Sequence, residues 1–180
     1  MIDEQALVQE LKDKTTQEQA FRILMSQYKE RLYWHVRKIV ISHDDADDVL
    51  QNTFIKVYRS IDKFNSESKI YSWMYRIATN EAITFINKKA KEKKVDISEY
   101  NLNMIHTLQE DSLYDGNEIQ LVLQQAIATL PKKQQLVFNM KYFDEIKYSD
   151  MSEMLETSVG ALKASYFHAV KKIEKIIKSH

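Results

Sequence analysis

Apolar residues recur every three or four positions along most of this chain, which is the spacing of one face of an α-helix. In the N-terminal half this pattern predicts three amphipathic helices, over residues 17–41, 44–61 and 71–91. The break between the first two contains Asp44 and Asp45, and either aspartate can cap the second helix and suits the positive end of its dipole. Residues 64–69 are polar and predict a loop before the third helix. The N-terminal half is therefore expected to be a small helical bundle.

The C-terminal half predicts four further helices. The first covers residues 119–130 and ends at Pro131, because the residue before a proline is pushed out of helical geometry. Pro131 itself is expected in the first turn of the second helix. A short helix follows over residues 148–155, and Thr157 or Ser158 is expected to cap the last helix. That last helix is expected to turn inward its apolar stripe of Val159, Leu162, Tyr166, Ala169, Ile173 and Ile176.

Between these halves the helical pattern fades. Residues 92–117 are polar and acidic and include Gly116, so we interpret this stretch as a linker. The expected organisation is a first domain over residues 1–92, an acidic linker over 93–117 and a second domain over 118–180.

The composition predicts an all-α fold of two small domains. The 180 residues include two glycines, one proline and no cysteine, and scarce Gly and Pro favour long helices over sheets with tight turns. Without glycines at fixed offsets the chain has no phosphate-binding loop, dinucleotide fingerprint or nucleophile elbow. The lack of cysteine excludes disulfides, thiolate metal sites and a cysteine nucleophile, and suits the cytoplasm. No apolar run has the length of a membrane span, and the N-terminus has no signal-peptide pattern, so we expect no membrane insertion.

The net charge of zero hides a segregation of charge along the chain. Residues 44–62 are acidic, residues 63–94 carry eight basic against three acidic side chains, residues 96–118 carry six acidic and no Lys or Arg, and residues 157–180 are basic again. Any single block could be a solvated helix face. The alternation favours two modules that bind a polyanion, joined by an acidic tether.

Residues 148–172 have the organisation of a helix-turn-helix: a short helix, a turn and a capped helix with an exposed basic face. Ser152 and Gly160 are expected where the two helices cross because both are small. The first turns of the second helix would approach base edges in the major groove. From the pattern alone, an ordinary pair of antiparallel helices explains these residues equally well.

Four strings, in this order, resemble the extracytoplasmic-function (ECF) group of the bacterial sigma-70 family of RNA polymerase sigma factors. They are Asp45–Phe54 (DADDVLQNTF), Tyr71–Ala82 (YSWMYRIATNEA), Leu130–Pro131 and Thr157–Lys163 (TSVGALK). The resemblance implies that residues 1–92 bind core RNA polymerase and recognise and melt the minus-ten element. It implies that residues 118–180 read the minus-thirty-five element of promoter DNA, and that an anti-sigma factor is a partner.

The resemblance also implies site residues. The contact with polymerase would use Asp45, Asp48, Leu50, Gln51 and Phe54, although Phe54 could instead lie in the core and the aspartates could simply cap their helix. The minus-ten element would be bound by Lys56, Ser60, Lys63, Phe64, Arg76, Ile77, Asn80, Lys88 and Lys89. The minus-thirty-five element would be bound by Ser158, Ala161, Lys163, Ala164, Ser165, Phe167, His168, Lys171 and Lys172.

Some residues qualify these expectations. Phe64, in a polar loop, is the expected stacking partner of an unpaired base, whereas Trp73 continues an apolar stripe and is expected in the core. Glu156 stands where a turn glycine is common in the family, so we expect the turn to avoid the left-handed conformation. Ser152 replaces a common alanine.

Other classes of function are less well supported. His43 and the aspartates after it lack the glycine and terminal glutamate of a calcium loop, and no triad order or zinc-protease spacing is present. We expect no metal, cofactor or catalytic residue. A stand-alone helix-turn-helix regulator and a helical adaptor without a DNA role remain alternatives. The acidic helix at 44–61 discriminates, because only a sigma factor gives it a polymerase partner.

Overall fold

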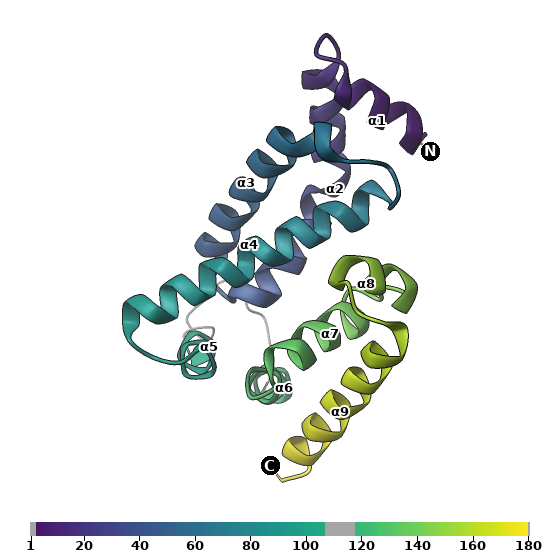
Figure 1. Cartoon of the computed structure of the whole chain (residues 1–180). Coiled ribbons are helices and arrows are strands. Elements are labelled where there is room, and N and C mark those ends of the chain that lie inside the picture. Colours follow the sequence, from purple (N-terminus) through teal and green to yellow (C-terminus); the bar gives the residue numbers. More distant parts are fainter. Residues whose placement is uncertain (1–2, 107–117, 180) are drawn as a thin grey trace.

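The computed structural model describes residues 3–106 and 118–179, and within these ranges every regular element is a helix (Figure 1). The first domain contains α1 (Glu4–Lys12), α2 (Gln17–Val40), α3 (His43–Ser60), the short 3-10 helix η1 (Ile61–Lys63) and α4 (Ile70–Lys93). The remaining helices are α5 (Ile97–His106), α6 (Glu118–Ala128), α7 (Lys132–Tyr142), α8 (Tyr148–Leu155) and α9 (Val159–Ile177). The prediction of an all-α fold is confirmed.

Serine side chains cap the N-termini of helices α3 and α9. The Ser158 hydroxyl accepts a hydrogen bond from the Ala161 amide at 3.3 Å, as one of the two expected caps of α9. At α3 the cap is Ser42, whose hydroxyl accepts from the Asp45 amide at 3.4 Å, and not Asp44 or Asp45 as expected. The helix begins one residue earlier than predicted, so both aspartates lie in its first turn.

The core of the first domain is formed by α2, α3 and α4. Their inner faces contribute fully buried side chains such as Leu32, Val57 and Met74. The sequence analysis missed α1, although its buried Leu7, Val8 and Leu11 have helical spacing and could have indicated it. Leu7 and Leu11 of α1 are buried against this core and cover one end of it.

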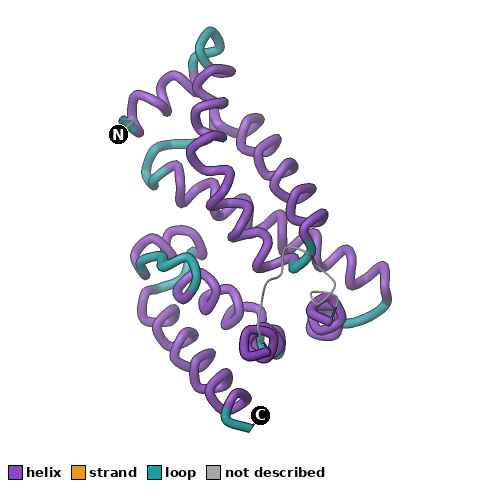
Figure 2. The backbone as a smooth tube through the Cα atoms, turned by 180° about the vertical axis from the view of Figure 1, so that it is seen from behind, coloured by secondary structure: helices purple, strands orange, loops and turns teal. Residues whose placement is uncertain are grey.

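The expected linker contains a helix, which corrects the interpretation of residues 93–117. Helix α5 packs against α4 and α6, and Figures 1 and 2 show α5 and α6 end-on beside each other. Tyr100 and Ile105 are 3% and 2% exposed, so this polar stretch hides a buried stripe. Only two of its buried side chains are apolar, since the third is Asn101, so the stripe did not stand out in a polar and acidic stretch. The rest of the expected linker, residues 107–117, lies outside the described residues.

The second domain packs α6 and α7 against α9, with Ile127, Phe138 and Ile173 in one buried cluster. Helices α8 and α9 form the expected helix-turn-helix, with Met151 and Leu162 buried between them.

Three expectations about this motif are wrong. Gly160 does not lie at the crossing, because a methyl group added to it would meet no atom within 4 Å. The turn is left-handed at Glu156, with φ 49° and ψ 42°. A non-glycine residue in this conformation costs on the order of 1 kcal/mol, which the packing of α8 and α9 offsets. Val159 is 37% exposed instead of inward.

The two domains pack against each other, α8 on α4 and α7 on α2. Asp144, after α7, lies between His35 and Lys38 of α2: its carboxylate is 3.3 Å from His35 Nδ1 and forms an ion pair with Lys38. His35 is buried and its other ring nitrogen is 2.8 Å from the Thr79 hydroxyl. Burial alone would raise the pKa of Asp144, but the hydrogen bonds and charges of His35 and Lys38 outweigh it and hold that pKa below its usual value.

Candidate functional site

A groove of about 760 Å³ runs between α2 and α3 on the outer side of the first domain. Of the residues predicted to contact polymerase, Asp48 and Gln51 are exposed at this groove. Leu50 and Phe54 also line it but are only 3% and 5% exposed, so they form its floor and belong to the core. Asp45 does not line the groove, and its carboxylate is 3.8 Å from Lys89 Nζ.

The exposed apolar area of this groove comes from residues that the sequence analysis missed. Ile55 and Tyr58 are both 41% exposed, and the Tyr58 ring packs edge-on against Phe21 of α2 at 5.0 Å. Their spacing of four and seven residues from Gln51 places all three on one helix face, so helical periodicity could have found them. The groove also contains Lys29 and Arg59, so its exposed apolar side chains lie among charges of both signs. Apolar side chains surrounded by polar and charged groups are the usual composition of a protein interface.

A second hollow, of about 410 Å³, lies at the loop before α4. It brings together Lys63, Phe64 and Arg76 from the predicted minus-ten set, with Asn65 and Trp73. The expected roles of the two aromatic residues are corrected here. Phe64 is 2% exposed and Trp73 is only half-buried, with their rings 5.2 Å apart. The loop folds back over the domain, so its aromatic side chain points into the core and Trp73 lines the hollow.

The second domain supplies one wall of this hollow. Ser152, Glu153 and Glu156 line it from α8 and its turn. Arg76 Nη1 lies 2.6 Å from Glu156 Oε1, and Lys69 Nζ lies 3.2 Å from Asp150 Oδ1. We call Asp150, Glu153 and Glu156 the acidic edge of α8. Their spacing of three residues was visible in the sequence, but only the packing of the domains shows what they face.

The other residues predicted for the minus-ten element are distributed along α3 and α4. Asn80, one helical turn after Arg76, is exposed, and Ile77, the next residue after Arg76, is half-buried. Lys56 pairs with Glu81, and the Ser60 hydroxyl donates to the Lys56 carbonyl at 2.5 Å. Lys88 and Lys89 lie farther along α4, about 18 Å from Arg76 at 1.5 Å per residue. Because of this distance, the residues predicted for the minus-ten element do not form one cluster. They lie in a row along α3 and α4, which we call the track.

The third surface is the outer face of α9. Of the predicted minus-thirty-five residues, Ser165 is half-buried. The others are exposed there: Ser158, Ala161, Lys163, Ala164, Phe167, His168, Lys171 and Lys172. Phe167 is 58% exposed, and Lys171 Nζ lies 5.7 Å from the centre of its ring. Lysines, small residues and a free aromatic ring on one helix face suit a nucleic-acid groove.

Among the described residues no group of three or more acidic, His or Cys side chains could hold a metal ion. His43, considered in the sequence, lies 2.5 Å from the Tyr33 hydroxyl and 3.7 Å from Asp47. Over the same residues, no helix has the length and apolar character needed to cross a membrane.

Comparison with known proteins identifies the class. The family model for sigma-70 region 2 matches residues 24–92, and that for sigma-70 region 4 matches residues 120–173. The two domains are thus those of a sigma-70 type factor. The chain is 30% identical over 158 residues to the ECF RNA polymerase sigma factor SigW of Bacillus subtilis, covering 83% of this chain and 84% of SigW. The chain belongs to the ECF RNA polymerase sigma factors, as the resemblance in the sequence indicated.

Other relatives agree. The ECF RNA polymerase sigma-E factor of Haemophilus influenzae is 28% identical over 186 aligned positions, covering 98% of this chain and 96% of that protein. The fold matches CnrH in complex with the cytosolic domain of CnrY, with a TM-score of 0.70, 17% identity and coverage of 98% and 97% of the two chains. It also matches the sigma factor RpoE of Bartonella quintana in complex with the anti-sigma factor NepR, with a TM-score of 0.65, 18% identity and coverage of 88% and 96%.

Proposed function

We propose that this sigma factor divides promoter-specific initiation among its three surfaces. Core RNA polymerase binds at the α2–α3 groove, the minus-ten element at the hollow and track on α4, and the minus-thirty-five element on α9. Residues 1–92 bind polymerase and the minus-ten element, residues 118–180 bind the minus-thirty-five element, and the residues between them connect the two domains. The observation that carries the proposal is the order of the surfaces: a groove with exposed apolar side chains among charged ones, a hollow in which Lys63 and Arg76 of the first domain lie beside aromatic rings, and a basic recognition helix.

At the polymerase groove, Asp48 and Gln51 supply polar specificity and Ile55 and Tyr58 the apolar contact area. Leu50 and Phe54 support this surface from below. Asp45 acts indirectly, by holding Lys89. This assignment is supported by the usual anatomy of protein interfaces, in which apolar anchors lie among polar groups.

At the minus-ten surface, Trp73 replaces Phe64 as the proposed stacking partner of an unpaired base, because its ring is accessible. Asn80 offers hydrogen bonds to a base edge, and Lys63 and Arg76 neutralise phosphates. Stacking on an aromatic side chain replaces the stacking that a base loses when the duplex opens. No bond is broken by this chain, so it acts as a binding subunit and not as an enzyme.

DNA and the acidic edge of α8 compete for the same hollow. The carboxylate of Glu156 partly neutralises Arg76 and would repel a phosphate placed beside it. We therefore propose that α8 leaves α4 when the sigma factor is assembled with polymerase on a promoter. An anti-sigma partner in the cytoplasm is proposed by analogy with the complexes of the structural relatives.

Run-off transcription tests the proposal. The purified chain is added to core RNA polymerase with a library of genomic fragments, and start sites are compared with those of core enzyme alone. Discrete new starts that share two upstream elements are expected. Binding to core without new starts would contradict the assignment as an initiation factor, and DNA binding without core binding would indicate the stand-alone regulator.

A further inference from the structure

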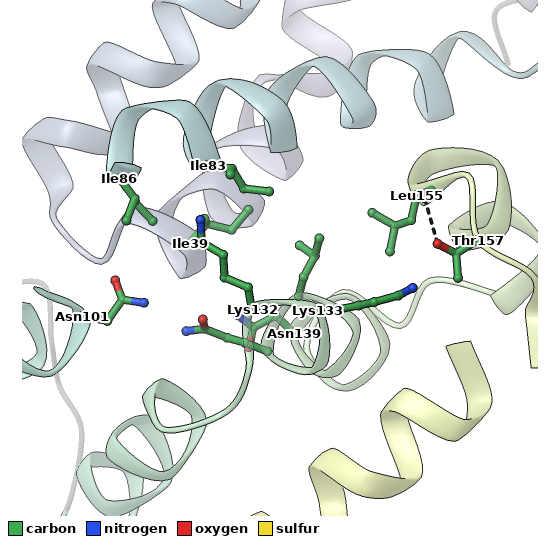
Figure 3. Close-up of a pocket in the computed structure, with 11 residues that line it drawn as sticks. Ile39, Ile83, Ile86, Asn101, Lys132, Lys133, Asn139, Leu155 and Thr157 are labelled. Carbon is green, nitrogen blue, oxygen red and sulfur yellow. Dashed lines mark hydrogen bonds between the residues drawn. The ribbon is translucent and has the colours of Figure 1, made fainter. Parts of the chain in front are cut away.

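A cavity of about 350 Å³ lies between the two domains and belongs to none of the three surfaces. Figure 3 shows Ile83 and Ile86 on α4, and Lys132 and Lys133 on α7. The Lys132 side chain reaches across toward Ile39 and α4, where it donates to Asn87, and Leu155 and Thr157 lie toward one end of the cavity and Asn101 toward the other. The wall is mainly aliphatic, with Ile39, Ile83, Ile86, Leu136 and Leu155. This volume lies within the range of small-molecule sites, which are mostly apolar with a few polar groups.

One buried polar group of the cavity lacks a hydrogen-bond partner. Asn101 of α5 is 3% exposed, and its side-chain oxygen has no partner. A buried amide oxygen without a hydrogen bond is unfavourable, and the amide can turn either its oxygen or its nitrogen toward a ligand. A ligand with a polar group would therefore be bound better than a purely apolar one.

The cations at the cavity lack an acid. Lys132 Nζ donates to Asn87 Oδ1 at 2.7 Å, which is a neutral acceptor. Within the described ranges neither Lys132 nor Lys133 has an ion pair. Partial burial lowers the pKa of Lys132, because the ammonium has lost some of its hydration. An anionic group would supply both the missing counter-charge and strong hydrogen bonds.

We propose that this cavity binds a small amphiphilic carboxylate, with its hydrocarbon chain against Ile39, Ile83 and Leu136 and its carboxylate at Lys132. Both domains contribute walls. A ligand bound there stabilises the packed arrangement of the domains by mass action and thereby keeps α8 on α4.

Calorimetric titration of the full-length protein with hexanoate, octanoate and decanoate, below their micelle concentrations, tests the proposal. Saturable one-to-one binding is expected, with affinity rising about fourfold per added methylene until the cavity is filled. 1-Octanol, which has the same chain without the charge, should bind at least about tenfold more weakly than octanoate. This comparison needs no variant.

Three variants locate the site. Lys132→Gln should weaken octanoate binding about tenfold by removing the charge. Ile83→Trp should abolish it by filling the cavity, and Lys175→Gln, an exposed lysine of α9, should leave it unchanged. Circular dichroism and thermal unfolding without ligand confirm that each variant is folded.

Several outcomes would overturn the proposal. They are the absence of saturable binding to the folded protein, binding of octanol as tight as that of octanoate, and unchanged affinity in Lys132→Gln. In the first case the space would belong to a side chain of a partner protein. None of these measurements involves polymerase, so the proposed function stands or fails separately.

Discussion

The two proposed DNA surfaces of this sigma factor differ in how much of each is free. On α9 the predicted residues other than Ser165 are exposed, and the ion pair of Lys171 is with Glu174 of the same helix, at 3.9 Å. At α4 the hollow has a wall from α8, and Arg76 is held by Glu156 of the other domain. Under the proposed assignment, α9 binds duplex DNA without rearrangement, whereas binding of DNA at the hollow on α4 requires the two domains to separate.

The largest effect is expected from removing the anchor between the domains. Asp144→Asn takes the charge away from His35 and Lys38, and breaking a buried ion pair of this kind costs about 3 kcal/mol. Urea denaturation at pH 7 measures the loss. An unchanged free energy of unfolding would contradict the view that the contacts of Asp144 with His35 and Lys38 stabilise the packing of the two domains. Glu10→Gln, on the exposed side of α1, is the control.

The same residue predicts a pH dependence. The pKa of Asp144 is held below its usual value in the folded protein, so its contribution to stability is present above the unfolded pKa of about 4. It is lost as the pH falls through the lower, folded pKa. The difference in stability between wild type and Asp144→Asn should therefore shrink under acid, and a constant difference in urea denaturation down to that range would disagree.

The next effect distinguishes DNA binding from domain packing. Arg76→Glu should lower open-complex formation about 100-fold, because a charged hydrogen-bond donor is replaced by a like charge to DNA. The double variant Arg76→Glu with Glu156→Arg restores the pair between domains but not the contact with DNA. Run-off transcription should stay low in both. Recovery in the double variant would assign Arg76 to packing alone, and Lys14→Glu on an exposed loop serves as control.

A smaller, opposite effect is expected from the partner of Arg76. Glu156→Gln keeps the shape of the side chain and removes its charge, so the hollow on α4 opens more easily. An exposed ion pair is worth up to about 1 kcal/mol, which corresponds to at most about a fivefold faster open complex. Stopped-flow fluorescence with 2-aminopurine in the minus-ten element measures the rate. Glu145→Gln is a matched control, since Glu145 is also exposed and left-handed, with φ 52°; a slower complex in Glu156→Gln alone would refute competition.

The smallest effect concerns the open surface. Lys171→Gln should weaken binding of minus-thirty-five duplex only a few-fold and reduce the slope of log affinity against log salt by about 1. Fluorescence anisotropy over a salt series measures both. The same change at Lys178, beyond the end of α9, should leave the slope unchanged.

Most of the helices could be predicted from the sequence, because a helix depends on residues that are close together in the chain. The ranges of α2, α3, α4 and α8 follow from the spacing of apolar residues, and Ser158 caps α9 through an amide three residues away. Helix α5 was missed because its buried side chains lie in a polar and acidic stretch, and α1 was missed although its buried residues have helical spacing. The family and its two recognition modules were likewise visible in strings of residues.

Most of the helices, the segregation of charge and the membership in the sigma factor family could be predicted from the sequence, because each depends on residues that are close together in the chain. The tertiary structure decided which side chains are accessible: Trp73 and not Phe64, and Ile55 and Tyr58 above Leu50 and Phe54. It also decided that Arg76 meets Glu156, eighty residues along the chain. Accessibility and ion pairs between domains depend on how helices pack, and one apolar stripe does not say which of its members faces the core and which lies at its edge.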